Sequence, residues 1–215
     1  MAGWNDLRAA LNELRSDPRS PLAGFPNPRS DGLLPPYQVG LQAWATDIAA
    51  DLHHRFGTQL ELTVGFLSYP DRRNLQPVWA FSQLLAPSDP LELGASLDSP
   101  LVVPSGHALH STVRIHNPTV RDVTLHTNGN LTAVIVDPEG GETVGGFSGL
   151  QPMPGVEFEI ASGASALVPL LVGTASLIPH LGFAIPTGLW AFRAPLALQD
   201  GRSLWTPPLD ITVTA

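Results

Sequence analysis

Hydrophobic residues at the start of the chain follow a helical period that then stops. Trp4, Leu7, Leu11 and Leu14 recur at every third or fourth position, which predicts an amphipathic helix over residues 3–15. Six prolines then interrupt the chain before residue 37. They predict a stiff, extended connection with no regular structure of its own.

Residues 37–66 change period twice, from strand to helix and back. Apolar and polar residues alternate over 37–41 and again over 60–66, which predicts two strands. Between them, apolar residues spaced by four predict a helix over 44–56, and Gly57 stands where a glycine commonly ends a helix. This β-α-β segment lacks the glycine-rich phosphate loop of a nucleotide-binding unit.

The rest of the chain shows short strands separated by turn residues. Pairs such as Asn128-Gly129 and Asp200-Gly201 separate apolar runs about ten residues apart, a pattern typical of a β-sandwich. Segment 173–187 holds two prolines and two glycines among apolar residues, so we expect a long ordered loop there. The predicted strands are 93–103, 108–117, 121–127, 131–137, 142–147, 156–161, 164–172, 188–198 and 203–214.

Together these patterns predict an α+β protein. A small N-terminal helix and β-α-β segment would be joined to a C-terminal antiparallel Ig-like β-sandwich. The expected divisions are an amphipathic helix with a proline-rich connection at 1–36, a small α/β segment at 37–90 and the sandwich at 91–215.

Composition narrows the classes of partner. Only 14% of the residues are charged, and 11 basic residues against 19 acidic ones give a net charge of −8. Because phosphate contacts need clustered Lys and Arg, nucleic acid is not an expected partner. The sequence contains no cysteine, which excludes disulfides, thiolate metal ligands and cysteine nucleophiles.

The first residues, MAGWNDLRAALNELRS, lack the basic and apolar regions of a signal peptide. No run of about 18 apolar residues occurs anywhere in the chain. We therefore expect a cytoplasmic protein that does not insert into a membrane.

The middle of the sequence carries a recognisable succession of strands and turns. Over residues 111–172 it contains STVRIHNPTVRDVTLHTNGNLTAVIVDPEGGETV and later VEFEIASGASALVPLLV. An Asn follows the first long strand, then V-T-L, a hairpin ending in Asp plus Gly, and a Ser162-Gly163 turn before a buried strand. TGLWAFRAPLAL supplies the start of a penultimate strand.

In these features residues 95–214 resemble bacterial Ig-like β-sandwiches, and among them the BsuPI type, named after an intracellular proteinase inhibitor. The resemblance implies an Ig-like fold and suggests protease inhibition as a function. The shared motifs are strand and turn patterns, and no reactive-site motif is matched, so no inhibitory residue follows from them. Residues 1–90 lie outside the resemblance.

Four of the seven histidines fall within a short stretch: His107, His110, His116 and His126. Strand alternation puts His110 and His116 on one polar face and His126 on the polar face of the next strand. Three imidazoles on adjacent strands could hold a metal ion such as zinc, which needs three or four convergent ligands. The same pattern is typical of a solvated sheet face, and both interpretations stay open.

The turn at 117–122 bears on this choice. If it opposes His116 with Thr124 across a hairpin, then Arg114 comes to oppose His126. A guanidinium among imidazoles works against binding a cation. This register therefore favours the solvated face.

A second cluster falls on the predicted helix of the β-α-β segment. Asp47, Asp51 and His54 share one face at spacings of three and four. Two carboxylates and an imidazole could bind a divalent ion or act as general acid and base. The alternative is a solvated helix surface in which Asp51 and Arg55 form an ordinary ion pair.

Two further features have a structural and a functional interpretation. Trp190 and Trp205 lie in the last predicted strands, where core packing is expected and an exposed aromatic platform is the alternative. The glycine-rich tract 140–149 favours a hairpin and an edge or bulged strand over a ligand loop.

No catalytic signature occurs. Gly146-Phe147-Ser148-Gly149-Leu150 departs from the nucleophile elbow G-x-S-x-G at its last position, and there is no H-E-x-x-H, Walker or EF-hand loop. We expect a non-catalytic binding or interaction module whose partner is another protein, without a cofactor. An enzyme is the less favoured interpretation.

Three alternatives stay open. A protease-inhibitor-like protein would need an exposed, rigid loop, for which the proline-containing segments 148–156 and 173–187 are candidates. A metal-dependent enzyme would use one of the two His and Asp sets above. A structural subunit of an assembly would dock through the helix at 3–15.

Overall fold

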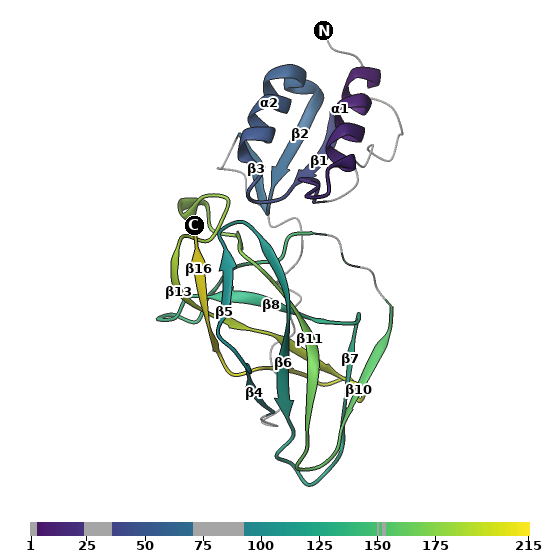
Figure 1. Cartoon of the computed structure of the whole chain (residues 1–215), viewed down its shortest axis with the longest axis vertical. Helices are drawn as coiled ribbons and strands as arrows, with labels where there is room; N and C mark the ends of the chain where they lie inside the picture. The colour runs from purple at the N-terminus through teal and green to yellow at the C-terminus, as the bar shows by residue number, and fades with distance from the viewer. Residues whose placement is uncertain (1–3, 24–35, 71–92, 150, 152–153) are drawn as a thin grey trace.

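The computed structural model describes residues 4–23, 36–70, 93–149, 151 and 154–215. Among the described residues strands predominate and there are two short α-helices, so this part of the protein is mostly β-sheet and β-sandwich-like. In Figure 1 both helices and the first three strands lie together at one end, and the remaining strands form the larger body. The boundary expected near residue 90 lies outside the described residues.

The N-terminal unit, defined as the described residues up to 70, has the predicted β-α-β order. Leu7 and Leu11 bury the apolar stripe of the first helix, and both long strands bury every second residue. The two strands flanking the second helix are parallel, as expected for a βαβ unit. The elements are α1 (Trp4–Ser16), β1 (Tyr37–Leu41), α2 (Thr46–Phe56), a 3₁₀ turn (Gly57–Gln59), β2 (Leu60–Val64) and β3 (Leu67–Tyr69).

Two boundaries in this unit differ from the prediction. α2 begins at Thr46, and Trp44 lies in the turn before it. β2 ends at Val64 because Gly65 has φ +60, a left-handed conformation that turns the chain into antiparallel β3. The C-terminal glycine was predicted correctly: Gly57 has φ +52, and its N–H donates to His53 O.

The second unit, residues 93–215, contains two sheets. One has four strands in the order β10-β7-β14-β15, and the other has nine, in which β4-β6-β11-β8-β13-β16-β5 form the main path and β9 and β12 attach beside β8. The strands are β4 (Gly94–Ser96), β5 (Leu101–Pro104), β6 (Ala108–His116), β7 (Val123–Thr127), β8 (Leu131–Val136), β9 (Thr143–Gly146), β10 (Val156–Ile160), β11 (Ser165–Gly173), β12 (Ala175–Ser176), β13 (Gly188–Arg193), β14 (Pro195–Leu198), β15 (Ser203–Trp205) and β16 (Leu209–Thr214).

One hydrophobic core lies between these sheets. Val113 and Ile115 of β6 enter it from the nine-stranded sheet, and Val123 and Leu125 of β7 enter it from the four-stranded sheet. Each strand contributes alternate residues, so period-two patterning places the apolar side chains inside and the polar ones outside.

Most strand pairs of the second unit are antiparallel, as expected for the predicted sandwich, but two are parallel. β11 pairs with β8 in parallel, and β16 pairs with β5 in parallel. In each pair at least two other strands separate the partners along the chain, so both can reach the shared ladder in the same direction. A single sequence shows where strands lie but not which strands are neighbours.

Three segments that were each predicted as a single strand form two strands in the structure. Segment 93–103 divides into β4 and β5, 188–198 into β13 and β14, and 203–214 into β15 and β16. At Ala194 and Thr206 the paired chain passes from one sheet to the other. There the Ala194 N–H donates to Thr206 Oγ1 at 2.9 Å, and the Thr206 N–H donates to Ala194 O at 3.0 Å.

The glycine-rich tract forms the predicted hairpin, with the Asp137 N–H donating to Glu142 O at 2.8 Å. β9 is not an edge strand, because it pairs with both β8 and β12, but its register with β8 shifts between Ile135 and Val136, in line with the bulged alternative. The glycines allow this crowding: a Cβ at Gly145 would collide with Ala175 O and lie 2.8 Å from Ile185.

Segment 173–187 is ordered, as predicted, and it joins the two units. Ala175 and Phe183 are buried in the same core as the helices and strands of the N-terminal unit. The Phe183 ring lies 6.0 Å from that of Tyr69 at the end of β3. The segment also contains β12 and a 3₁₀ turn at Pro179–Leu181. Segment 173–187 therefore connects the second unit to the core of the N-terminal unit.

A second contact between the units involves the first histidine of the cluster. His107 stacks on Trp44, with ring centroids 5.6 Å apart and planes inclined by 2°. Gly106 beside it has φ +78, and a Cβ there would lie 2.9 Å from the backbone nitrogen of Trp44. The two backbones approach so closely that only glycine fits.

Candidate functional site

The histidines of β6 do not converge. His110 and His116 are both exposed on the outer face of this strand, six positions apart, which corresponds to about 20 Å along an extended chain. His116 Nδ1 lies 3.1 Å from both Ala164 O and Ser165 Oγ. Its environment is the neighbouring strand rather than another histidine.

His126 belongs to the other sheet, so the predicted register between β6 and β7 is wrong. His126 is opposite Glu157 on one side and Ala197 on the other. Arg114, expected to oppose it, instead forms an ion pair with Asp98 at 2.9 Å. The 117–122 segment carries the chain across to the opposite sheet.

β6 and β7 lie in different sheets because both strands are amphipathic. A flat hairpin would leave their apolar faces side by side, whereas crossing between sheets lets those faces pack against each other. Within the described ranges, no three His, Asp or Glu side chains are grouped so that they could hold a metal ion.

The helix cluster lies on the surface. Asp47, Asp51 and His54 are all exposed on α2. The predicted pair is confirmed, with Arg55 Nη1 3.1 Å from Asp51 Oδ2. An exposed pair of this kind contributes well under 1 kcal/mol.

The most tightly organised surface feature is the loop 117–122, at the end of the sandwich away from the N-terminal unit (Figure 1). Asn117 is fully buried at its base. Its amide donates to Arg121 O at 2.7 Å and to Ile160 O at 3.0 Å. Its Oδ1 accepts the Thr119 N–H at 3.1 Å and lies 2.7 Å from the Thr119 hydroxyl. One buried side chain thus ties both ends of the loop.

A neighbouring turn holds the same loop from outside. The Ser162 hydroxyl donates to Thr119 O at 2.7 Å, and the Ser162 N–H donates to Asp122 Oδ1 at 2.8 Å. The Gly163 N–H donates to Asn117 O at 2.9 Å. Hydrogen bonds therefore restrain the loop on both flanks.

The tip of this loop is apolar. Val120 is 92% exposed, compared with 67% for Leu189 and 48% for Leu167, two of the other large hydrophobic side chains on the surface. Arg121 follows it and is also exposed. We call residues 117–122 the Val120 loop.

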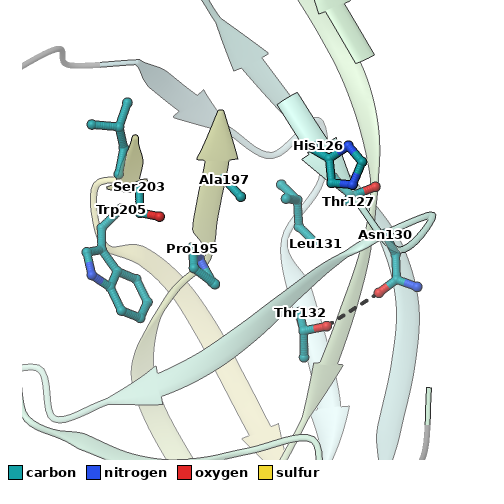
Figure 2. A pocket seen from close by; sticks show the side chains of 10 residues that line it. His126, Thr127, Asn130, Leu131, Thr132, Pro195, Ala197, Ser203 and Trp205 are labelled. Atoms are coloured by element: carbon teal, nitrogen blue, oxygen red, sulfur yellow. Dashed lines mark hydrogen bonds between the residues drawn. The ribbon is translucent and has the colours of Figure 1, made fainter. Parts of the chain in front are cut away.

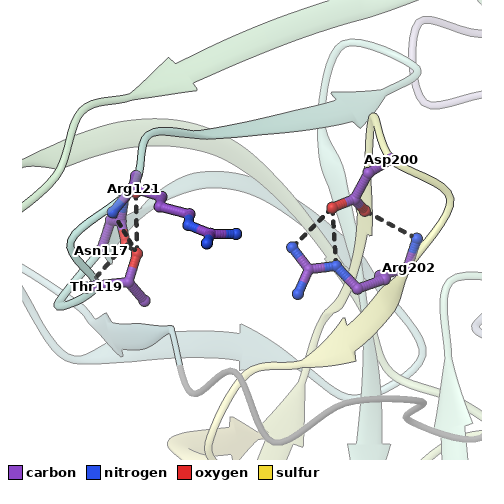
Figure 3. Close-up of polar contacts among 5 residues, drawn as sticks. All are labelled: Asn117, Thr119, Arg121, Asp200 and Arg202. Atoms are coloured by element: carbon purple, nitrogen blue, oxygen red, sulfur yellow. Dashed lines mark hydrogen bonds and ion pairs between the residues drawn. The ribbon is translucent and has the colours of Figure 1, made fainter.

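A charged turn lies near this loop. Arg202 Nη2 is 2.7 Å from Asp200 Oδ2, and hydrogen bonds from the Arg202 side chain and backbone lower the pKa of Asp200 below its usual value. Figure 3 shows the Arg121 side chain extending from the loop toward this pair. Arg121 and Arg202 therefore place two guanidinium groups at this end of the molecule, and Arg202 is paired with Asp200.

Of the two segments proposed as inhibitory loops, 173–187 differs from that expectation. The other, 148–156, is described only in part, and because its Pro154 and Gly155 are exposed, the expectation for it stays a prediction. Segment 173–187 does not protrude, because Phe183 anchors it in the core shared with the N-terminal unit. In 148–156, residues 150, 152 and 153 lie outside the described residues. Gln151 is half-buried, with its Oε1 accepting from Asn128 and from Thr132.

A pocket of about 280 Å³ opens on the outer side of the four-stranded sheet. In Figure 2 His126 and Asn130 stand on one side of it, Ser203 and Trp205 on the other, and Pro195 and Ala197 between them. The pocket forms where the β7–β14 ladder, which pairs His126 with Ala197, ends before Pro195. We call it the Trp205 pocket.

Both tryptophans are half-buried, so the expectation of core packing is met only in part. Trp190 packs on the sandwich core and donates its indole N–H to Pro186 O at 2.9 Å. Trp205 packs on a small outer cluster that includes Val134, and the Arg193 guanidinium lies 5.6 Å from its ring centroid.

Sequence analysis identified His126 and Trp205 but missed the Val120 loop. Asn117-Pro118 was visible as a turn signal, and a valine in a polar loop is unremarkable by itself. The missing information is tertiary: the carbonyl of Ile160, which receives one Asn117 hydrogen bond, lies 43 positions away in the chain.

No protein-family model matches the chain, and no curated protein matches it. Similarity to solved structures is low. Secreted serine protease VesC from Vibrio cholerae is 14% identical, with a TM-score of 0.30, over 58% of this chain and 23% of its own. This chain therefore spans about a quarter of the length of VesC.

Two smaller domains give comparable values. The cupredoxin domain of amoB from Nitrosocaldus yellowstonii is 15% identical, with a TM-score of 0.24, over 51% of this chain and 57% of its own. The PapD-like domain 7 of human CEP192 is 13% identical, with a TM-score of 0.24, over 64% of this chain and 98% of its own. Similarities at this level carry no argument about family or function.

No helix among the described residues is both long and apolar enough to span a lipid bilayer.

Proposed function

We propose that the protein is a non-catalytic, cytoplasmic binding module that recognises another protein through the Val120 loop. The observation that carries the proposal is a 92% exposed valine on a loop whose base is a fully buried, hydrogen-bonded asparagine. The proposal retains an α+β architecture in which an Ig-like sandwich presents the loop.

The energetic argument rests on pre-organisation. Ordering a flexible loop on binding costs free energy, and a loop already ordered in the free protein avoids that cost. Asn117 orders this loop before any partner arrives. Burial of Val120 in a partner's pocket would then add about 1.5–3 kcal/mol of hydrophobic free energy.

The test is quantitative affinity capture from a soluble extract of the source organism with the full chain as bait. Val120→Asp should lose partners that the wild type retains. Val102→Asp is the matched control, because Val102 is also exposed, at 47%, but lies on β5 of the nine-stranded sheet. Equal loss with both variants, or with neither, would argue against the Val120 loop as the recognition element.

A protease-inhibitor-like function is the second candidate, and one observation favours it. Protease inhibition needs a rigid, exposed loop, and the Val120 loop has both properties. Its small apolar tip would suit a protease with a small apolar specificity pocket, of the kind found in elastase.

Inhibition of such a protease can be measured directly with a chromogenic peptide. We expect wild-type protein to inhibit, and Val120→Asp to weaken inhibition by roughly 30-fold, the effect of losing an interface anchor worth about 2 kcal/mol. Rapid cleavage after Val120 without inhibition would mean that the loop is a substrate, and would remove this candidate.

A further inference from the structure

The Trp205 pocket has a chemistry that the proposed protein-binding role does not use. Its base is apolar, with Pro195 and Ala197 from β14. Trp205 forms part of one wall. A ligand that enters it must therefore present an apolar face to these side chains.

Polar groups around the rim are available for a ligand. Ser203 Oγ, Asn130 Nδ2 and the ring nitrogens of His126 form no hydrogen bond with other side or main chains in the described ranges. Glu157 Oε1 lies 3.8 Å from His126 Nδ1, which is longer than a hydrogen bond. A hydroxyl, an amide and an imidazole can both donate and accept, so they suit ligand hydroxyl groups.

The lining contains no Arg, Lys, Asp or Glu. A phosphate, a carboxylate or an ammonium group would find no Arg, Lys, Asp or Glu side chain among the lining residues, so its desolvation would be poorly compensated. The Arg193 guanidinium lies over Trp205 and is held by Thr206 O at 3.0 Å, outside the set of lining residues. The lining chemistry therefore selects a neutral ligand.

Size narrows the choice further. About 280 Å³ is close to the lower limit of small-molecule pockets, roughly 300–1,000 Å³. A neutral sugar ring has this size, an apolar face and several hydroxyl groups at its edge. Its C–H face can pack on the apolar base and the indole edge, while its hydroxyls reach Ser203 and Asn130.

From these observations we propose that the Trp205 pocket binds one ring of a neutral saccharide. The site is on the outer face of the four-stranded sheet, whereas the Val120 loop is at the end of the sandwich. The two proposals therefore stand or fall separately.

The experiment is a titration of the ¹⁵N-labelled full chain, followed by two-dimensional NMR. The probes are glucose, galactose, N-acetylglucosamine, maltose and cellobiose. We expect at least one to shift the Trp205 indole N–H and the amides of Thr127 and Thr132 saturably, with a dissociation constant of about 1 mM, equivalent to roughly 4 kcal/mol.

Two variants localise the site. Trp205→Ala should weaken binding at least about tenfold. Because that change also removes packing on Val134, Ala197→Phe provides an independent test: it fills the pocket from an exposed position and should abolish binding without loss of folding. Trp190→Ala, which alters a half-buried tryptophan outside the pocket, should keep the saccharide response.

Three results would overturn the proposal: no saccharide shifts these signals, the shifts survive Ala197→Phe, or the pocket binds glucuronate or N-acetyl-phenylalanine amide more tightly than every neutral sugar. The last result would assign the pocket to a charged ligand or to a peptide side chain. Capture of a protein partner through Val120 would be unaffected by any of them.

Discussion

The two ordered connections 117–122 and 173–187 serve the molecule in opposite ways. Segment 173–187 is apolar and directs Phe183 inward, into the core of the N-terminal unit. Segment 117–122 is mostly polar and directs its one large apolar side chain, Val120, into solvent. The two segments therefore differ in their anchors: buried apolar side chains such as Ala175 and Phe183 hold 173–187, whereas the buried amide of Asn117 holds 117–122.

The comparison also separates two kinds of stabilisation. Segment 173–187 is held by hydrophobic burial, which is non-directional and tolerates repacking. The Val120 loop is held by hydrogen bonds from the Asn117 amide and from the turn at Ser162, which fix a particular backbone shape. A recognition loop benefits from directional hydrogen bonds, because they keep its backbone in one shape even when the surrounding side chains rearrange.

The largest expected effect on the free energy of unfolding is at Phe183, where segment 173–187 contacts the N-terminal unit. Phe183→Ala should lower the free energy of unfolding by about 3 kcal/mol, since a buried aromatic ring is lost and a cavity remains. Chemical denaturation followed by tryptophan fluorescence measures this. Phe183→Leu should recover most of the loss. If Phe183→Ala were as stable as wild type, segment 173–187 would not be the connector that we describe.

The next effect is at the base of the Val120 loop. Asn117→Ala should cost about 2–3 kcal/mol, because several hydrogen bonds of about 1 kcal/mol each are lost and carbonyls such as Ile160 O are left unpaired. Asn117→Asp has the same shape but turns an oxygen toward those carbonyls, so it should destabilise at least as much. Asn130→Ala, which alters a half-exposed amide, is the control in thermal melts and should change little.

A smaller effect is expected where the two units meet at the surface. His107→Ala should cost roughly 0.5–1 kcal/mol through loss of the stack on Trp44. His110→Ala alters an exposed histidine of β6, which begins just after His107 and gives His110 no ring partner among the described residues; this variant should be neutral in the same denaturation experiment. Equal effects would mean that the stacking does not couple the units.

The smallest effect on stability is expected at the loop tip. Val120→Asp should change the free energy of unfolding by less than about 0.5 kcal/mol, because the side chain is 92% exposed and forms no buried contact. A change of that size keeps the variant usable in binding experiments. A loss of several degrees in the melting temperature would show that Val120 packs on a neighbour, and would weaken the case for a free recognition tip.

Sequence patterning predicted the elements better than their arrangement. The first helix and the β-α-β order were correct because local period and a C-terminal glycine determine them. The sandwich strands were located to within a few residues, except that 93–103 is two strands and that the chain changes sheets at Ala194 and Thr206. Strand partners were not predictable, because pairing depends on which apolar faces meet across the core.

The candidate sites illustrate the same limit. Alternation correctly put His110, His116 and His126 on polar faces, yet their relative placement depended on whether 117–122 was a hairpin turn or a crossing between sheets. The deciding contact is the amide of Asn117, which bonds carbonyls on both sides of the crossing. No local pattern encodes that contact.

By itself the sequence determined the secondary structure, the exclusion of cysteine chemistry and the absence of any catalytic motif, because these follow from residue identity and short-range spacing. Only the tertiary structure decided that the histidines are separated, that segment 173–187 is internal, and that Val120 stands exposed beside a buried asparagine. Those properties depend on contacts between residues distant in the chain, which form only when the two sheets close over a common core.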